Sequence, residues 1–385
     1  MVGDRTGLGG LGAPRHDRFA RWPQAAARAV LAFFLLLAAL AAVAPGYAPP
    51  PPPVPKVTVR DAAGHMVVRQ EDDNDLRLYR RIIARVRAGE NYYHAAVSEQ
   101  RSNNYPVIPG FTVRLPTMAV LAATLGDRAM IGLGLVLLAA MLLALWRRVM
   151  GEAGGAERMP MAVSLALVGL ASGLNFKFDV LHEIWAAKLI VLSVALHRPR
   201  EGRWGWSWLV AAAGLAVREL VLPYVLLMGA MALWRRRMAE AGAWLLLVVL
   251  FGAALALHLH LAAAQVQPGD PVSPPWLVLS GISGWLYKIN NSTLLYLLPV
   301  WLSGPVLVAA LLGWAGWRTP LGALGFLLSA GYAVMFMIAG RDNNFYWGLL
   351  ISPMLLMGAA FLPISLPSLW RAAGLGSPGR SAVRA

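Results

Sequence analysis

The residues that could do chemistry begin in one long polar segment, residues 72–116, of an otherwise apolar chain. Near its start, Asp75 and Tyr79 are four residues apart. A carboxylate beside a membrane surface can act as a general base that deprotonates an acceptor hydroxyl for attack on an activated sugar. Asp75 also fits a second role, because acidic residues at the start of a helix cap its free N–H groups and complement its dipole. The residue types alone leave both roles open.

A second group of polar residues comprises Asp179, His182 and Glu183. The spacings of three and four residues put them on one face of a helix. Such a face can hold a weakly bound divalent cation, or bind a phosphate through it, and it can also form structural ion pairs. Lys188 follows within an apolar run, where an ammonium group is expected to face a cavity or an acidic partner.

Two arginines, each followed by an acid, are the third group: Arg218-Glu219 and Arg341-Asp342. A guanidinium at the level of the lipid headgroups suits a lipid-linked phosphate, because it is always charged and makes bidentate contacts. The alternative is that Arg218 pairs with Glu219 or Asp342. Four aromatic residues near these groups are candidates for stacking on a sugar: Trp276, Trp285, Tyr287 and Trp347.

The elements that position these residues are predicted to be membrane helices. The chain has 385 residues, of which 58% are hydrophobic and 14% charged, with a mean hydropathy of +0.57. Apolar runs of bilayer-spanning length predict an all-α polytopic membrane protein with about ten transmembrane helices. The predicted spans are 25–44, 129–146, 159–175, 181–197, 206–217, 220–234, 241–263, 295–317, 320–339 and 346–364.

Charge predicts the orientation of these spans. The net charge is +15, but the arginines lie in short clusters at helix ends rather than along a continuous basic face, so nucleic acid is not the expected partner. Ten spans put every cluster outside the long first loop on the cytoplasmic side. We therefore expect cytoplasmic tails at 1–23 and 365–385, a transmembrane domain at 24–364, and an external loop at 45–128. A signal peptide is the alternative for the first span, but its length favours an uncleaved helix.

The external loop has its own local structure. Residues 56–70 predict a small β-hairpin. From residue 73 the apolar positions recur at helical spacing, which predicts an amphipathic helix ending near Gly89, and a second helix is expected at 92–101. Both are expected to lie along the membrane surface. The loop at 265–291 is long enough for a re-entrant or surface helix that closes a cavity.

Several classes of function lack support in the sequence. The chain has no cysteine, which excludes disulfides and thiolate metal sites. It contains no Walker loop, GxSxG elbow or HExxH motif, so ATP-driven transport and the common hydrolase mechanisms have no motif behind them.

The external loop resembles a known family. The runs DLRLY (75–79), GENYY (89–93), YP (105–106) and RLP (114–116) resemble the first external loop of GT-C membrane glycosyltransferases. The resemblance is closest to the polyprenol-phosphate-mannose-dependent type of family 87. The runs HEIWA (182–186) and RDNNFYWG (341–348) are similar to segments of related uncharacterised bacterial membrane proteins.

This resemblance implies an inverting transferase of the bacterial inner membrane with a periplasmic active site. Its donor would be a polyprenyl-phosphate sugar carrying a hexose such as mannose, and its acceptor a glycan or lipid; a divalent cation would be at most weakly required. Asp75 would be the catalytic base, and Arg218 or Arg341 would contact the donor phosphate. The other residues expected to bind substrate are Tyr79, Tyr92, Tyr93, Glu99, Arg114, His182, Glu183, Lys188, Glu219 and Asp342.

Two other functions stay open at this stage. A transporter or flippase of lipid-linked saccharide would depend on Lys188 and on the break at Arg218. A non-catalytic membrane scaffold would tolerate loss of all the polar residues named above.

Overall fold

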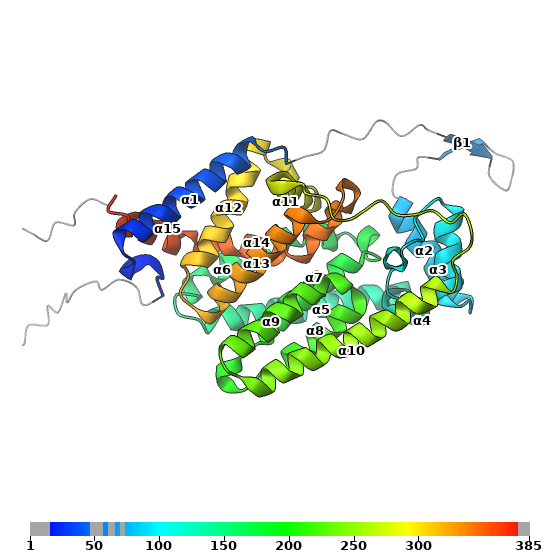
Figure 1. Cartoon of the computed structure of the whole chain (residues 1–385), viewed down its shortest axis with the longest axis horizontal. Helices are drawn as coiled ribbons and strands as arrows, with labels where there is room; N and C mark the ends of the chain where they lie inside the picture. The colour runs from blue at the N-terminus through cyan, green and yellow to red at the C-terminus, as the bar shows by residue number, and fades with distance from the viewer. Residues whose placement is uncertain (1–15, 47–56, 61–65, 70–73, 376–385) are drawn as a thin grey trace, which may run out of the picture.

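The computed structural model describes residues 16–46, 57–60, 66–69 and 74–375. Nearly all of this is helical, and the α-helices form a bundle with a smaller group of helices at one end (Figure 1). The α-helices are α1 Gln24–Val43, α2 Asn74–Arg87, α3 Tyr92–Ser102, α4 Thr117–Leu125, α5 Asp127–Met150, α6 Met159–Gly169, α7 His182–Leu196, α8 Gly205–Val217, α9 Leu222–Trp234, α10 Met238–Ala263, α11 Gly281–Ser292, α12 Val300–Gly316, α13 Pro320–Ile338, α14 Ser352–Met357 and α15 Leu362–Ala372.

Short 3-10 helices and one hairpin complete the structure. The 3-10 helices are η1 Phe19–Arg21, η2 Gly110–Thr112, η3 Ala156–Arg158, η4 Ala171–Leu174, η5 Phe176–Phe178, η6 Pro199–Glu201, η7 Glu219–Val221, η8 Leu294–Leu297, η9 Asp342–Leu350 and η10 Gly358–Phe361. Strands β1 Val57–Arg60 and β2 Met66–Arg69 pair antiparallel, with Val57 opposite Arg69. The hairpin expected at 56–70 is therefore present in its described part.

Five helical segments of the described chain are long and apolar enough to cross a bilayer, which makes this a helical membrane protein. They are Gln24–Val43, Asp127–Met150, Met238–Ala263, Pro320–Ile338 and Ser352–Ala372, the last of which joins α14, η10 and α15. Shorter apolar helices occupy the remaining predicted spans. Helices α8 and α9 have 13 residues each, about 20 Å, which is less than the ~30 Å hydrocarbon core of a bilayer.

Two boundaries differ from the sequence prediction. The last span was expected at 346–364, but its first residues form η9 and the α-helix begins only at Ser352. The helical chain then continues to Ala372, so the predicted tail begins inside α15. Helix α4 was not predicted, because its nine residues are too few to span a membrane and lie inside the predicted external loop at 45–128.

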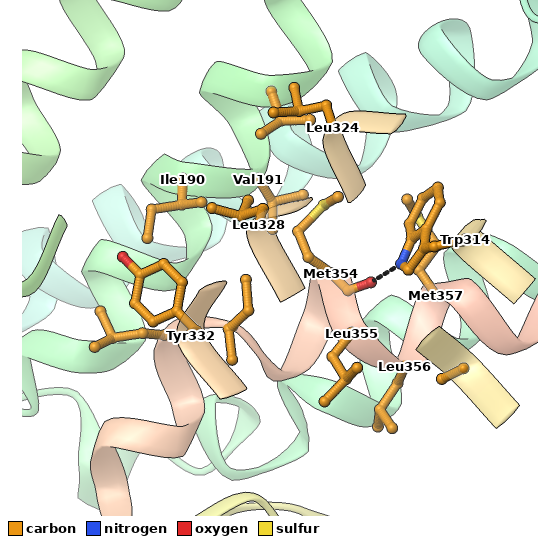
Figure 2. Packing of buried hydrophobic residues seen from close by; sticks show 14 of the residues in the cluster. Ile190, Val191, Trp314, Leu324, Leu328, Tyr332, Met354, Leu355, Leu356 and Met357 are labelled. Atoms are coloured by element: carbon orange, nitrogen blue, oxygen red, sulfur yellow. Dashed lines mark hydrogen bonds between the residues drawn. The ribbon is translucent and has the colours of Figure 1, made fainter. Parts of the chain in front are cut away.

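The hydrophobic core is centred on α14, which the surrounding helices enclose. Met354, Leu355 and Met357 are fully buried and meet side chains from α7, α12 and α13 (Figure 2). The indole Nε1 of Trp314 donates to the carbonyl of Met354 at 2.8 Å. Glycine allows the close approach here, because a Cβ at Gly313 would lie 2.0 Å from a backbone oxygen. A buried, well-packed centre gives the polar groups around it fixed positions.

The helices of the external loop form a cap on one end of the bundle, at the right of Figure 1. The apolar face of α2, with Leu78 and Ile82, is buried against Tyr92 and Ala96 of α3 and Ala119 of α4. The two amphipathic helices expected in this loop are therefore present as α2 and α3, and the apolar face of α2 packs against protein. This face forms the roof of a cavity.

A candidate active site beneath the α2–α4 cap

A cavity of about 880 Å³ lies under this cap. Its walls come from α2, α3, the segment between α3 and α4, α4 itself, the start of α5, the loop before α7 with its first turn, η7, residues 276–277 and residues 341–347. Much of the lining is apolar and the charged groups come from separate elements, as in a typical small-molecule site. The structure brings Asp75, Tyr79, Tyr92, Arg114, His182, Glu219 and Arg341 of the predicted residues to this cavity.

Asp75 lies in the first turn of α2 and lines the cavity. The hydroxyl of Tyr105 is hydrogen-bonded to its carboxylate. The role of Asp75 as a helix cap is compatible with this position, since a carboxylate in the first turn complements the helix dipole. Its carboxylate also lines the large cavity, so the place allows both roles.

Arg114 organises the floor beneath Asp75. Its Nε donates to the Tyr79 hydroxyl at 3.1 Å, and its Nη2 donates to the Tyr346 hydroxyl at 3.2 Å. Burial raises the pKa of the Tyr79 phenol, so this group stays protonated. No carboxylate of the described residues forms an ion pair with Arg114, but Glu183 and Glu219 lie near enough to act on its charge.

The sequence leaves two roles open for Arg218, contact with a lipid-linked phosphate and pairing with Glu219 or Asp342. Its extended backbone (φ −151°, ψ 121°) separates α8 from α9, as the predicted break requires. The side chain is 1% exposed; Nε donates to Glu183 Oε1 at 2.7 Å, and Nη1 pairs with Glu219. The alternative of pairing with Glu219 is thus what the structure contains. Arg218 is not among the residues that line the cavity.

Of the two arginines expected to contact the donor phosphate, Arg218 and Arg341, it is Arg341 that lines the cavity. Its guanidinium carbon lies 5.7 Å from the ring centre of Trp276, a cation–π distance. Three buried nitrogen atoms of residues that line the cavity have no hydrogen-bond partner among the described residues: Arg341 Nε, Trp347 Nε1 and His182 Nδ1. A buried polar atom without a partner costs free energy unless a ligand or water satisfies it.

The side chains of Asp179, His182 and Glu183 do not converge on one point. Glu183 pairs with Arg218, whereas Asp179 Oδ1 lies 3.8 Å from Arg80 Nη2. The His182 ring packs edge-on against Tyr79, with centroids 5.3 Å apart. No group of three metal-ligating side chains occurs in the described part of the chain. These residues do not fit a divalent cation, and we assign no step to one.

Some predicted residues lie elsewhere. Glu99 pairs with Arg81 at 3.1 Å and with Arg85 at 3.0 Å, on the outer side of α3. The Tyr93 hydroxyl is hydrogen-bonded to Nδ1 of His258 at 3.2 Å, away from the cavity.

Tyr92, Lys188 and Asp342 are the remaining residues that were expected to bind substrate. Tyr92 reaches the cavity, but its phenol donates to the Arg114 carbonyl at 2.5 Å, so it supports the floor. Lys188 opens instead onto a smaller cavity nearby. The side chain of Asp342 is outside the described residues.

The cavity also contains residues to which the sequence analysis gave no role. Arg80 donates to the carbonyl of Lys177 at 2.7 Å and lies near Asp179, which ties α2 to the loop before α7. Burial raises the pKa of Asp179 above its ordinary value. Tyr346, which the sequence shows only as part of the run RDNNFYWG, accepts a hydrogen bond from Arg114. Neither the contact of Arg80 with Lys177 nor that of Arg114 with Tyr346 can be predicted from the sequence, because each joins segments far apart in the chain.

Comparisons with family models, curated proteins and solved structures give no match. The functional argument therefore depends on the geometry of the cavity.

Proposed function

We propose that the chain is a membrane-embedded glycosyltransferase that moves a hexose from a polyprenyl-phosphate donor to a hydroxyl acceptor. The observation that carries this proposal is the composition of the cavity. One wall bears the carboxylate of Asp75, and other walls bear Arg114, which donates to two phenol hydroxyls, and Arg341, whose buried Nε has no hydrogen-bond partner among the described residues. A base and an anion site in one enclosure are what transfer from a phosphate leaving group requires.

The positions of Asp75, Arg114 and Arg341 suggest the role of each residue in the reaction. Asp75 accepts the proton of the acceptor hydroxyl, and the acceptor oxygen forms a bond to the anomeric carbon from the face opposite the phosphate. The bond between that carbon and the phosphate oxygen breaks, and its electron pair leaves with the polyprenyl phosphate. The configuration at the anomeric carbon inverts. Arg341 and Arg114 stabilise the negative charge that develops on the phosphate.

The rest of the cavity suits a lipid-linked substrate. Met118, Ala119 and Ala122 of α4 and Met130 of α5 form an apolar wall, where a hydrocarbon chain loses contact with water at a gain of ~25 cal/mol per Å². Trp276 and Trp347 offer faces for a sugar ring. The sugar would then lie between the aromatic wall and Asp75.

The test is Asp75→Asn in a transfer assay with purified protein in membranes and a radiolabelled polyprenyl-phosphate hexose. We expect the rate to fall by about 10²–10⁴-fold, the usual contribution of a general base. The matched control is Asp127→Asn, because Asp127 also lines the cavity but pairs with Arg87 at 2.6 Å. Full activity of Asp75→Asn would overturn the assignment of the base.

The transporter alternative makes a different prediction in the same membranes. If no donor sugar is transferred by the wild type, while movement of the lipid-linked saccharide across the membrane depends on Lys188, the protein is a flippase. The scaffold alternative predicts that neither assay responds to Asp75→Asn or Lys188→Met.

A further inference from the structure

A second cavity, which we call the side slot, lies next to the large one. Its volume is about 220 Å³, and it is formed by α5, the end of α6 with η4, and α7. Met130 and Asp179 line both cavities, so the two adjoin at these residues. The volume is below the ~300 Å³ at which drug-sized pockets begin. It suits one narrow chain rather than a ring system.

The outer rim of the side slot is apolar and open. Leu135 of α5 is 49% exposed and Leu174 of η4 is 51% exposed. Helix α5 is one of the candidate membrane spans, so its exposed apolar surface is covered by hydrocarbon in a bilayer. The rim therefore opens toward lipid chains rather than toward water.

One cation lies inside this apolar slot. Lys188 is 6% exposed, and its Nζ lies 3.4 Å from the carbonyl of Gly134 and 4.7 Å from the ring centre of Trp185. No carboxylate of the described residues forms an ion pair with it: Glu183, five residues earlier, is held by Arg218, and Asp179, which lines the same slot, lies 3.8 Å from Arg80 Nη2. An ammonium group enclosed by apolar side chains requires an anion or a polar ligand to offset its lost hydration.

We propose that the side slot binds a single-chain anionic amphiphile, with its hydrocarbon chain between α5 and η4 and its anionic group at Lys188. The apolar walls supply affinity for the chain, and the ammonium supplies selection for the charge. The carrier phosphate of the proposed donor and the phosphate of a membrane lipid share this chemistry. The site does not depend on transfer activity, since it is defined by binding alone.

The chain offers a clean way to measure occupancy, because it contains no cysteine. Leu174→Cys introduces a single thiol at the rim of the slot. Its labelling by a maleimide is followed in detergent solution while hexadecyl phosphate, hexadecanol or inorganic phosphate is added. We expect hexadecyl phosphate to slow labelling at a concentration about tenfold lower than hexadecanol, which is the usual value of a hydrogen bond to a charged group. Inorganic phosphate should not protect the thiol.

Three further variants, each combined with Leu174→Cys, separate the parts of the site. Gly134→Leu fills the slot, because a Cβ at Gly134 already lies 3.6 Å from Lys188 Nζ and from the Trp185 ring; protection should be lost. Gly132→Leu is its control on the same helix, since a Cβ there meets nothing within 4 Å. Lys188→Met keeps the length of the side chain and removes the charge, so hexadecyl phosphate and hexadecanol should protect equally.

The source of the amphiphile follows from the chain that binds best. Stronger protection by farnesyl phosphate than by hexadecyl phosphate assigns the slot to an isoprenoid carrier, and the reverse assigns it to a straight-chain membrane lipid. Equal protection of the wild-type slot by hexadecanol and hexadecyl phosphate would overturn the proposal. Loss of protection in Gly132→Leu would overturn it as well. None of these results depends on sugar transfer, so the outcome is independent of the Asp75→Asn assay.

Discussion

The two ends of the helix bundle both carry arginines, but they use them in opposite ways. At the end where α5 finishes, Arg203 has a side chain that is 75% exposed and lies 3.5 Å from Glu201, and Arg198 donates to the carbonyl of Arg147 at 3.3 Å. At the cavity end, Arg218 is 1% exposed between Glu183 and Glu219. The residue type is the same, and the surroundings decide its role.

This difference shows which arginines belong to topology and which to a site. An exposed guanidinium keeps its water and gains little from a partner, so a cluster of them can follow the charge bias of the membrane. An enclosed guanidinium needs carboxylates or hydroxyls placed around it by several elements. Arg114 and Arg218 are of the second kind.

The largest expected effect at the cavity end comes from Arg218→Met. The change leaves Glu183 and Glu219 without their cation in an enclosed place, which should lower the free energy of unfolding by about 3–5 kcal/mol. Thermal unfolding in detergent measures this loss. Adding Glu183→Gln should restore part of it, because one uncompensated charge is removed. An unchanged unfolding temperature in the single variant would contradict the ion-pair assignment.

Arg114→Lys tests the floor of the cavity. The lysine retains the charge but cannot bridge the hydroxyls of Tyr79 and Tyr346, since it lacks the planar fork of arginine. We expect a loss of about 1–3 kcal/mol in unfolding free energy from the hydrogen bond that is left unmade, together with slower transfer. If Arg114→Lys matches the wild type in both measurements, the bridge does not organise the site.

A pH titration tests the ion pair that fixes the loop before α11. The Arg101 guanidinium holds the pKa of Asp270 at about 2, and the two side chains are hydrogen-bonded. Because the folded pKa lies below the unfolded value of about 3.9, the pair stabilises the fold fully above ~pH 5, and this contribution is lost as the pH falls toward 2. A nitroxide on Val272→Cys should gain mobility in this interval.

The control for the titration is Arg101→Gln. It removes the cause of the low pKa, so the label on Val272→Cys should already be more mobile at pH 7 and should change less between pH 5 and pH 2. A mobility that is independent of both pH and Arg101 would show that the backbone pairing of 107–108 with 271–273 holds the loop by itself.

The smallest expected effect is at the opposite end. Arg203→Ala removes an exposed cation beside Glu201, and we expect the free energy of unfolding to change by no more than about 0.5 kcal/mol. The same thermal assay used for Arg218→Met applies. A loss comparable to that of Arg218→Met would remove the distinction between the two ends.

Much of the fold follows from local patterns in the sequence. The apolar runs predicted helices in every range where α1, α5–α10, α12 and α13 occur, and α11 lies in the loop that was expected to be long enough for a re-entrant or surface helix. The helical spacing of the apolar residues predicted α2. Gly89, whose φ is +92°, predicted the end of that helix. The predictions were wrong where the conformation of a short segment depends on its contacts with other segments of the chain. The last span begins at Ser352 rather than at 346, and α4 was missed because nine apolar residues resemble any loop that contacts a core.

The candidate site likewise has features that follow from the sequence and features that only the structure shows. The sequence by itself determined which residue types are present at this end of the helices, including Asp75, His182 and Arg341, because helix length and charge bias are local properties. Only the tertiary structure decided that Glu183 neutralises Arg218, 35 residues away, and that Lys188 faces a separate slot. Such pairings depend on the distance between elements remote in sequence, and no periodicity records that distance.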